Sequence, residues 1–202
     1  MFTIRQSFRR RDEIIKLLSV FKSSLNAVHR CFATLDKLDD SKKQYVTKCL
    51  QEISRIFINA LQGKHYDAES VRAKIADIFE LMQKNKECIS NGVAMKIIRF
   101  LQDLEESMEN TIGIKTHGSP ISLRAYCLVF IYVFPFIFIP TLVYSMQQGD
   151  AWVVYSLAII HGFILISLYN VQDHMENPFD QVGLDDINLE EFQFRQQQKT
   201  PA

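Results

Sequence analysis

Four cysteines and five histidines are the residues of this chain best suited to redox, metal or acid–base chemistry. They are Cys31, Cys49, Cys88 and Cys127, and His29, His65, His117, His161 and His174. No two cysteines form a CxxC pair, and their spacings fit neither a zinc site nor a disulfide framework. The histidines are scattered, and the sequence holds no GxSxG, HExxH, P-loop or Rossmann glycine pattern. We therefore expect no catalytic residue, no metal and no cofactor, and predict that the protein is not an enzyme.

One histidine stands in an unusual place. His161 lies inside an apolar segment, residues 151–169, that is long enough to enter a membrane. An ionisable side chain within a membrane helix is a functional candidate by default. The alternative is a neutral imidazole that is hydrogen-bonded to a neighbouring helix, with Gly162 allowing close packing. We favour the neutral, structural histidine.

The overall composition conceals two different halves. Lys plus Arg number 23 and Asp plus Glu number 23, so the net charge is zero. That balance argues against a nucleic-acid-binding protein, which usually carries a basic excess. The mean hydropathy of −0.03 resembles that of a soluble protein, yet between residues 122 and 170 only Arg124 and Asp150 are ionised. Residues 1–118, in contrast, are rich in charge.

The charge-rich half shows helical periodicity. Its first apolar seam, with steps of three and four residues, is Ile14, Leu18, Phe21, Leu25, Val28, Phe32 and Leu35. Such spacing places the side chains on one helix face. We expect this helix to end near residues 36–41, where polar, turn-forming residues gather. The seam predicts packing in a helical bundle, within the chain or between subunits, with a free-standing coiled coil as the alternative.

Three further helices are expected in the same half. Their apolar stripes are Val46, Cys49, Leu50, Ile53, Phe57, Ala60 and Leu61; then Val71, Ile75, Ile78 and Met82; then Ile97, Leu101, Leu104 and Met108. Gly63 is a suitable stop after the first of them, and Asp67 a suitable N-terminal cap for the second. The sequence Ser90-Asn91-Gly92 separates the last two. Residues 1–118 are thus predicted to form a cytosolic four-helix bundle.

The apolar half predicts a transmembrane hairpin over residues 119–172. A bilayer core requires about 20 apolar residues in a helix, and residues 123–146 and 151–169 each meet that need. The turn between them has no Lys or Arg, whereas Arg99 and Lys115 precede the first span and Arg124 lies at its very start. Basic residues favour the cytosolic side. We therefore expect an all-α integral membrane protein, with both termini cytoplasmic and the turn outside.

Two short motifs flank the hairpin and carry a family resemblance. Ser119-Pro120-Ile121 opens the first span, and Glu176-Asn177-Pro178-Phe179 follows the second. With the order of helices, turn, two spans and Asn-Pro-Phe motif, the chain resembles the bestrophin family of pentameric ion channels, including its bacterial members. The resemblance covers roughly residues 10–192. Asn-Pro-Phe alone is a weak signal, but both motifs around two spans are fairly specific.

The resemblance implies a function and a site. It implies a channel subunit in a lipid bilayer, such as the bacterial inner membrane, that assembles as a homo-oligomer, a pentamer in the family. The permeant ions would be anions such as chloride or, alternatively, cations. In the family the isoleucine of the Ser-Pro-Ile turn forms the narrow cytosolic aperture, which by position is Ile121, and a ring of apolar side chains can gate by dewetting. The competing hypothesis is a non-conducting membrane scaffold or accessory protein.

An acidic segment follows the Asn-Pro-Phe motif, within the cytosolic tail of residues 173–202. In animal relatives this region contributes to a calcium clasp, and the residues that fall there are Asp180, Asp185, Asp186 and Glu190. Carboxylates and backbone oxygens are suitable ligands for calcium. The acidic run is interrupted by residues 181–184, as in the bacterial pattern, so we expect a solvated acidic tail in place of a calcium site.

The chain departs from the family at its N-terminal side. Family members carry two further membrane spans before the cytosolic helices, and the second of these lines the pore neck. No stretch of residues 1–118 is long and apolar enough to replace them. The expectation is a truncated or divergent relative, or one whose missing spans come from another chain.

Overall fold

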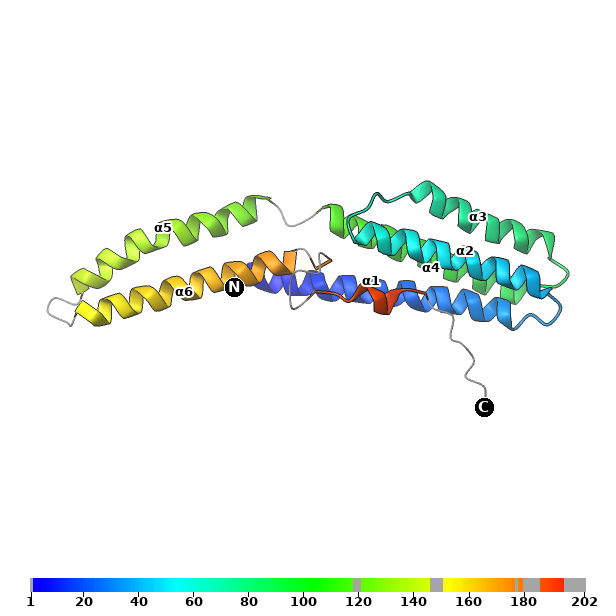
Figure 1. Cartoon of the computed structure of the whole chain (residues 1–202), viewed down its shortest axis with the longest axis horizontal. Coiled ribbons are helices and arrows are strands. Elements are labelled where there is room, and N and C mark those ends of the chain that lie inside the picture. The colour runs from blue at the N-terminus through cyan, green and yellow to red at the C-terminus, as the bar shows by residue number, and fades with distance from the viewer. Residues whose placement is uncertain (1, 118–120, 146–150, 177, 180–185, 195–202) are drawn as a thin grey trace, which may run out of the picture. The chain divides into compact units, whose positions relative to one another are not determined.

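The structure is a computed structural model that describes residues 2–117, 121–145, 151–176, 178–179 and 186–194. In chain order these residues form α1 (Phe2–Ala33), α2 (Asp40–Leu61), α3 (Ala68–Lys84), α4 (Asn91–Thr116), α5 (Ile121–Ser145), α6 (Ala151–Glu176) and the short 3-10 helix η1 (Leu189–Phe192) (Figure 1). No strand occurs among them. The predicted all-α class is confirmed.

The chain divides into two compact units. The bundle unit contains residues 12–116, Phe179 and residues 187–194. The hairpin unit contains α5 and α6 together with residues 2–11. In this division the first three turns of α1 group with the hairpin, and residues 187–194 group with the bundle.

The apolar seam of α1 forms the centre of the bundle unit. Ile14, Leu18, Phe21, Leu25, Val28 and Phe32 are each at most 1% exposed. The ring of Phe21 meets that of Phe57 from α2, with centroids 4.5 Å apart. Because these side chains are buried within a single chain, the seam packs inside the bundle and is not the contact face of a free-standing coiled coil.

The stripes predicted for the next three helices are also buried. Every residue named above for α2, α3 and α4 is at most 6% exposed and lies in the core. Each of these helices keeps a charged outer face, which is the pattern expected of an amphipathic helix that buries one stripe. From residue 12 onward, α1 to α4 therefore pack around one apolar core.

Local capping explains where two of the helices end and begin. Gly63, with φ of +96°, follows the end of α2. Its N–H donates to the carbonyl of Ala60 at 3.2 Å, while the N–H of Lys64 donates to that of Asn59 at 3.1 Å, as in a Schellman motif. Asp67 caps α3 by accepting the N–H of Ser70 at 3.0 Å, and hydrogen bonds from Ser70 lower the pKa of the Asp67 carboxyl. Both sequence expectations are confirmed.

A lysine joins the last turn of α4 to the C-terminal end of α2. The Nζ of Lys115 donates to the carbonyl oxygens of Ala60 at 2.6 Å and Leu61 at 3.0 Å. A cation is favourable there because the last carbonyls of a helix carry partial negative charge. Burial lowers the pKa of Lys115. The point at which the chain leaves the bundle is thus fixed against a second helix.

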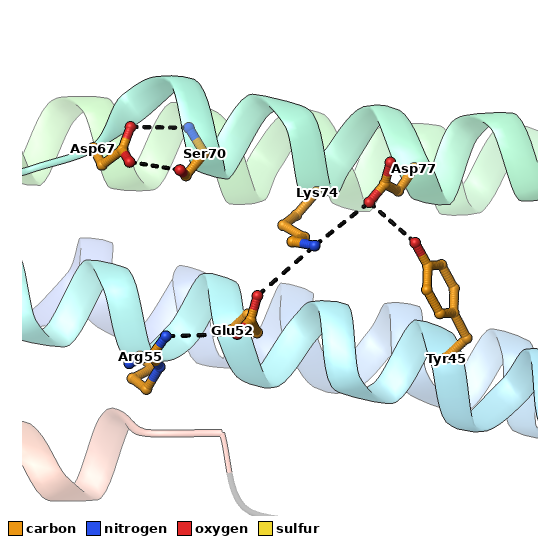
Figure 2. A network of polar contacts seen from close by, with 7 residues as sticks. All are labelled: Tyr45, Glu52, Arg55, Asp67, Ser70, Lys74 and Asp77. Atoms are coloured by element: carbon orange, nitrogen blue, oxygen red, sulfur yellow. Dashed lines mark hydrogen bonds and ion pairs between the residues drawn. The ribbon is translucent and has the colours of Figure 1, made fainter.

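A polar network holds α2 against α3 along their exposed edge (Figure 2). Lys74 of α3 pairs with Glu52 of α2 at 3.8 Å and with Asp77 of its own helix at 3.6 Å. The hydroxyl of Tyr45 donates to Asp77 at 3.1 Å, and this bond raises the pKa of Tyr45 to about 12. Ion pairs as exposed as these each contribute little to the free energy of folding. We therefore infer that the network mainly fixes the register of α2 against α3.

In the hairpin unit, α5 and α6 run side by side and antiparallel (Figure 1). Among the described residues, one helical stretch, Trp152–Val171, is long and apolar enough by length and composition to cross a membrane, and Ile131–Ser145 is a shorter apolar one. α5 continues through Pro135 and Pro140. The hydroxyls of Thr141 and Ser145 donate to carbonyls of their own helix at 2.7 and 2.8 Å, which suits an environment without water.

Candidate functional site

The surface of the hairpin is apolar on nearly every side. Its exposed large apolar residues include Val129, Tyr132, Phe136, Ile137, Val143, Trp152, Tyr155, Ile159, Phe163 and Ile166. Phe136 is 81% exposed and Phe163 is 71% exposed. A helix that is hydrophobic all round must be covered, by lipid or by other protein. Two helices alone cannot cover each other, so this surface requires a bilayer, further subunits, or both.

His161 lies on the inner side of this hairpin, against two aromatic rings of α5. Its imidazole stacks on Phe134 and Phe138 with centroid distances of 4.9 and 4.6 Å. The buried Nε2 has no hydrogen-bond partner among the residues that the structure describes. The expected bond from a neutral imidazole to a neighbouring helix is therefore not seen at Nε2. Aromatic stacking holds the ring instead.

The last described segment, residues 187–194, packs against the helices of the bundle unit and is called the strap. Ile187, Leu189 and Phe194 are 4%, 0% and 7% exposed. The N–H of Phe194 donates to the Oγ of buried Ser54 in α2 at 2.9 Å, and its ring meets the edge of His29 in α1 at 5.6 Å. Burial lowers the pKa of His29, and the charge of Arg30 lowers it further by a smaller amount. The strap therefore rests on both α1 and α2.

A second contact holds the middle of the strap. The Nζ of Lys22 in α1 donates to the carbonyl of Glu191 at 2.6 Å. The acids of this segment led to the expectation of a solvated tail. Glu190 and Glu191 are indeed exposed, but the apolar residues between the acids are buried or half-buried. Those apolar positions, Ile187, Leu189, Phe192 and Phe194, were the signal that could have revealed the strap.

The fold of this chain matches that of solved structures of bacterial bestrophin homologs. A single-substitution variant of the homolog from Klebsiella pneumoniae superposes with a TM-score of 0.81 at 12% identity, covering 95% of this chain and 78% of that one. A second structure of the Klebsiella pneumoniae homolog gives 0.76 at 13% identity, with 95% and 77% covered. The chain has the bestrophin fold. No protein-family model matches it, and no curated protein sequence matches it either.

Within the bestrophin fold, the predicted aperture residue lies at the start of α5. Ile121 is the first residue of that helix. Ser119 and Pro120, the other members of the turn, lie outside the described residues. The position of Ile121 along the chain is thus defined, while its role at an aperture stays a prediction.

The Asn-Pro-Phe motif connects the hairpin of the bestrophin fold to the bundle. Glu176 is the last residue of α6, and Asn177 lies outside the described part of the chain. Pro178 is buried. Phe179 is 7% exposed and belongs to the same apolar cluster as the α1 seam. The described part of the motif therefore ends in one aromatic side chain that is buried in the bundle core.

The four acids considered for calcium are only partly described. Asp180 and Asp185 lie outside the described residues, Asp186 is half-buried, and Glu190 is exposed in η1. The backbone N–H of Glu190 donates to the side chain of Asn188 at 3.2 Å. No group of three potential metal ligands occurs in the described ranges. The expectation of a tail without a calcium site stays a prediction.

Proposed function

We propose that this chain is a subunit of a bestrophin-like ion channel, with the bundle in the cytosol and the hairpin across the bilayer. One observation carries the proposal: the fold of bacterial bestrophin homologs extends over 95% of the chain with a TM-score of 0.81. The 20-residue apolar stretch of α6 supports it, because about 20 residues span a bilayer core.

Conduction requires several copies of the chain. A hairpin of two helices encloses no pathway for ions, so the pore must form between copies around an axis. The exposed apolar surface of α5 and α6 offers faces for both lipid and neighbouring subunits. We infer a homo-oligomer, a pentamer as in the bestrophin family.

The aperture is proposed at Ile121. This residue opens α5, whose first turn contains no acidic residue. The first N–H groups of a helix are unpaired and carry partial positive charge. Several α5 N-termini around an axis would favour anions beside an apolar ring that controls wetting. We therefore propose anion conduction, such as chloride, with cation conduction as the alternative.

A non-conducting membrane scaffold is the second candidate. This chain covers 78% of the length of the first matched structure. A scaffold would keep the bundle and the hairpin in the membrane without forming a pore of its own.

Chloride flux into liposomes distinguishes the two. Purified protein is reconstituted alone, and again together with a full-length bestrophin relative whose own pore is blocked by substitution. Flux with the protein alone supports a channel subunit. Flux restored only in the mixed vesicles supports an accessory role, and no flux in either preparation contradicts the channel proposal.

A further inference from the structure

The first three turns of α1 form a basic segment that does not continue the bundle core. Residues 2–11 contain Arg5, Arg9, Arg10 and Arg11 and no acidic residue. On the helix face of Ile14, the positions four, seven and eleven residues earlier are Arg10, Ser7 and Thr3. The apolar stripe therefore stops at Ile14, although the helix begins at Phe2.

The basic segment belongs to the hairpin unit and not to the bundle unit. Residues 2–11 group with α5 and α6, whereas the helix from residue 12 onward groups with the bundle. Arg5 and Arg9 lie one helical turn apart, so their side chains share a face. Phe8, between them in sequence, is 50% exposed. Basic and aromatic side chains thus occur together in the same unit as the apolar hairpin.

This combination matches the surface of an anionic membrane. A cluster of arginines close to a membrane helix attracts anionic headgroups, and the attraction fades within a Debye length. Arginine also binds phosphate through two parallel hydrogen bonds. An exposed aromatic ring gains by entering the interfacial layer. A nucleic acid would fit the charge, but it would not account for the grouping with the hairpin.

We propose that residues 2–11 bind anionic phospholipid headgroups at the cytosolic face of the membrane, through Arg5 and Arg9 and with Phe8 in the interface. The inference rests on the proposed membrane placement of the hairpin. It adds a lipid partner that the channel proposal does not require. Bound lipid would hold the first turns of α1 at the bilayer surface.

Thermal unfolding of the full chain in uncharged detergent measures the binding. Phosphatidylglycerol is titrated against phosphatidylcholine, and the concentration that gives half of the stabilising shift is recorded. We expect phosphatidylglycerol, but not phosphatidylcholine, to raise the unfolding temperature, and we expect added salt to weaken this effect. In the double variant Arg5→Gln, Arg9→Gln, the phosphatidylglycerol concentration at the half-point should rise about 25-fold, since each arginine near an anionic surface contributes roughly a factor of five in affinity.

A matched variant and a second ligand make the result decisive. Lys37→Gln, Lys86→Gln removes the same charge from exposed positions of the bundle unit and should respond as the wild type does. The inference is overturned if both double variants lose the same lipid affinity. It is also overturned if phosphatidylcholine raises the unfolding temperature as much as phosphatidylglycerol does. An equal shift with inorganic phosphate also overturns it, because the site would then bind free phosphate. This experiment measures no current. A protein that binds phosphatidylglycerol as expected but does not conduct would therefore contradict the channel proposal and leave the lipid site in place.

Discussion

His161 shows, as a single residue, how an apolar hairpin accommodates a polar ring. The imidazole is held by Phe134 and Phe138, and its Nε2 is buried with no hydrogen-bond partner in the described chain. An unpaired buried polar atom costs about 1–3 kcal/mol. The stacked arrangement is therefore stabilised by the flat aromatic ring of His161, whereas its unpaired Nε2 opposes it.

Replacing His161 by phenylalanine tests this role of the ring. His161→Phe keeps a flat ring in the stack and removes the unpaired nitrogen, so we expect equal or greater stability, by up to about 1–3 kcal/mol. Thermal unfolding in detergent measures the change. Tyr155→Phe, at a site that is 70% exposed, serves as the control and should have no effect. A clear loss of stability in His161→Phe alone would show that Nε2 has a required partner.

Ile121 is the residue on which the proposed aperture depends. Ile121→Ala shortens the side chain at the start of α5, so an apolar ring there would widen and its dehydration barrier would fall. We expect a change in unit conductance or in relative ion permeability. Ile137→Ala, the same substitution at an outer position that is 64% exposed, should leave both unchanged. If the two variants conduct alike, Ile121 is not the aperture.

Among the elements, the strap of residues 187–194 makes one hydrogen bond to a buried side chain of the bundle, from Phe194 to Ser54. Ser54→Ala would leave the N–H of Phe194 unpaired, at a cost of about 1–3 kcal/mol. We expect faster hydrogen exchange in the strap and a lower unfolding midpoint. Ser107→Ala is the matched control, because the hydroxyl of buried Ser107 donates to Leu104 of its own helix at 2.8 Å. Equal effects of the two substitutions would mean that the bond does not hold the strap.

The elements also differ in how far the sequence reveals them. The α1 seam, the Gly63 stop and the Asp67 cap were predicted correctly because each depends on residues within one or two helical turns. The strap was missed because its contact joins Phe194 to Ser54, 140 positions apart. The beginning of α1 at Phe2 was missed for another reason: the apolar stripe that marks the helix starts only at Ile14.

The features of the candidate site also differ in whether they could be predicted from the sequence. The hairpin was predicted from its composition, since an uncharged run of this length is rare in the helices of soluble proteins. The stacking of His161 on Phe134 and Phe138 could not be predicted, because it depends on the register of α6 against α5. Phe179 was recognised as part of a motif, but its burial in the bundle core follows only from the fold.

For the molecule as a whole, we infer the proposed orientation in the membrane from the residues between the two proposed spans. That loop, residues 147–150, lies outside the described residues and contains no Lys or Arg. We expect Gln148→Cys to react with an impermeant thiol reagent applied to intact cells. The wild type should not react, because Cys31, Cys49 and Cys88 belong to the bundle unit, which we place in the cytosol, and Cys127 falls near the cytosolic end of the first proposed span. Labelling of Gln148→Cys only after lysis would reverse the orientation.

An oligomeric ion channel with the bestrophin fold must carry unitary current. Purified wild-type protein, with its oligomeric mass established in detergent, is fused into a planar bilayer between unequal potassium chloride solutions. We predict discrete current steps whose reversal potential lies toward that of chloride. A reversal potential toward that of potassium would retain the channel and replace the anion by a cation. Silent bilayers, with oligomeric protein shown to be inserted, would contradict the proposed channel.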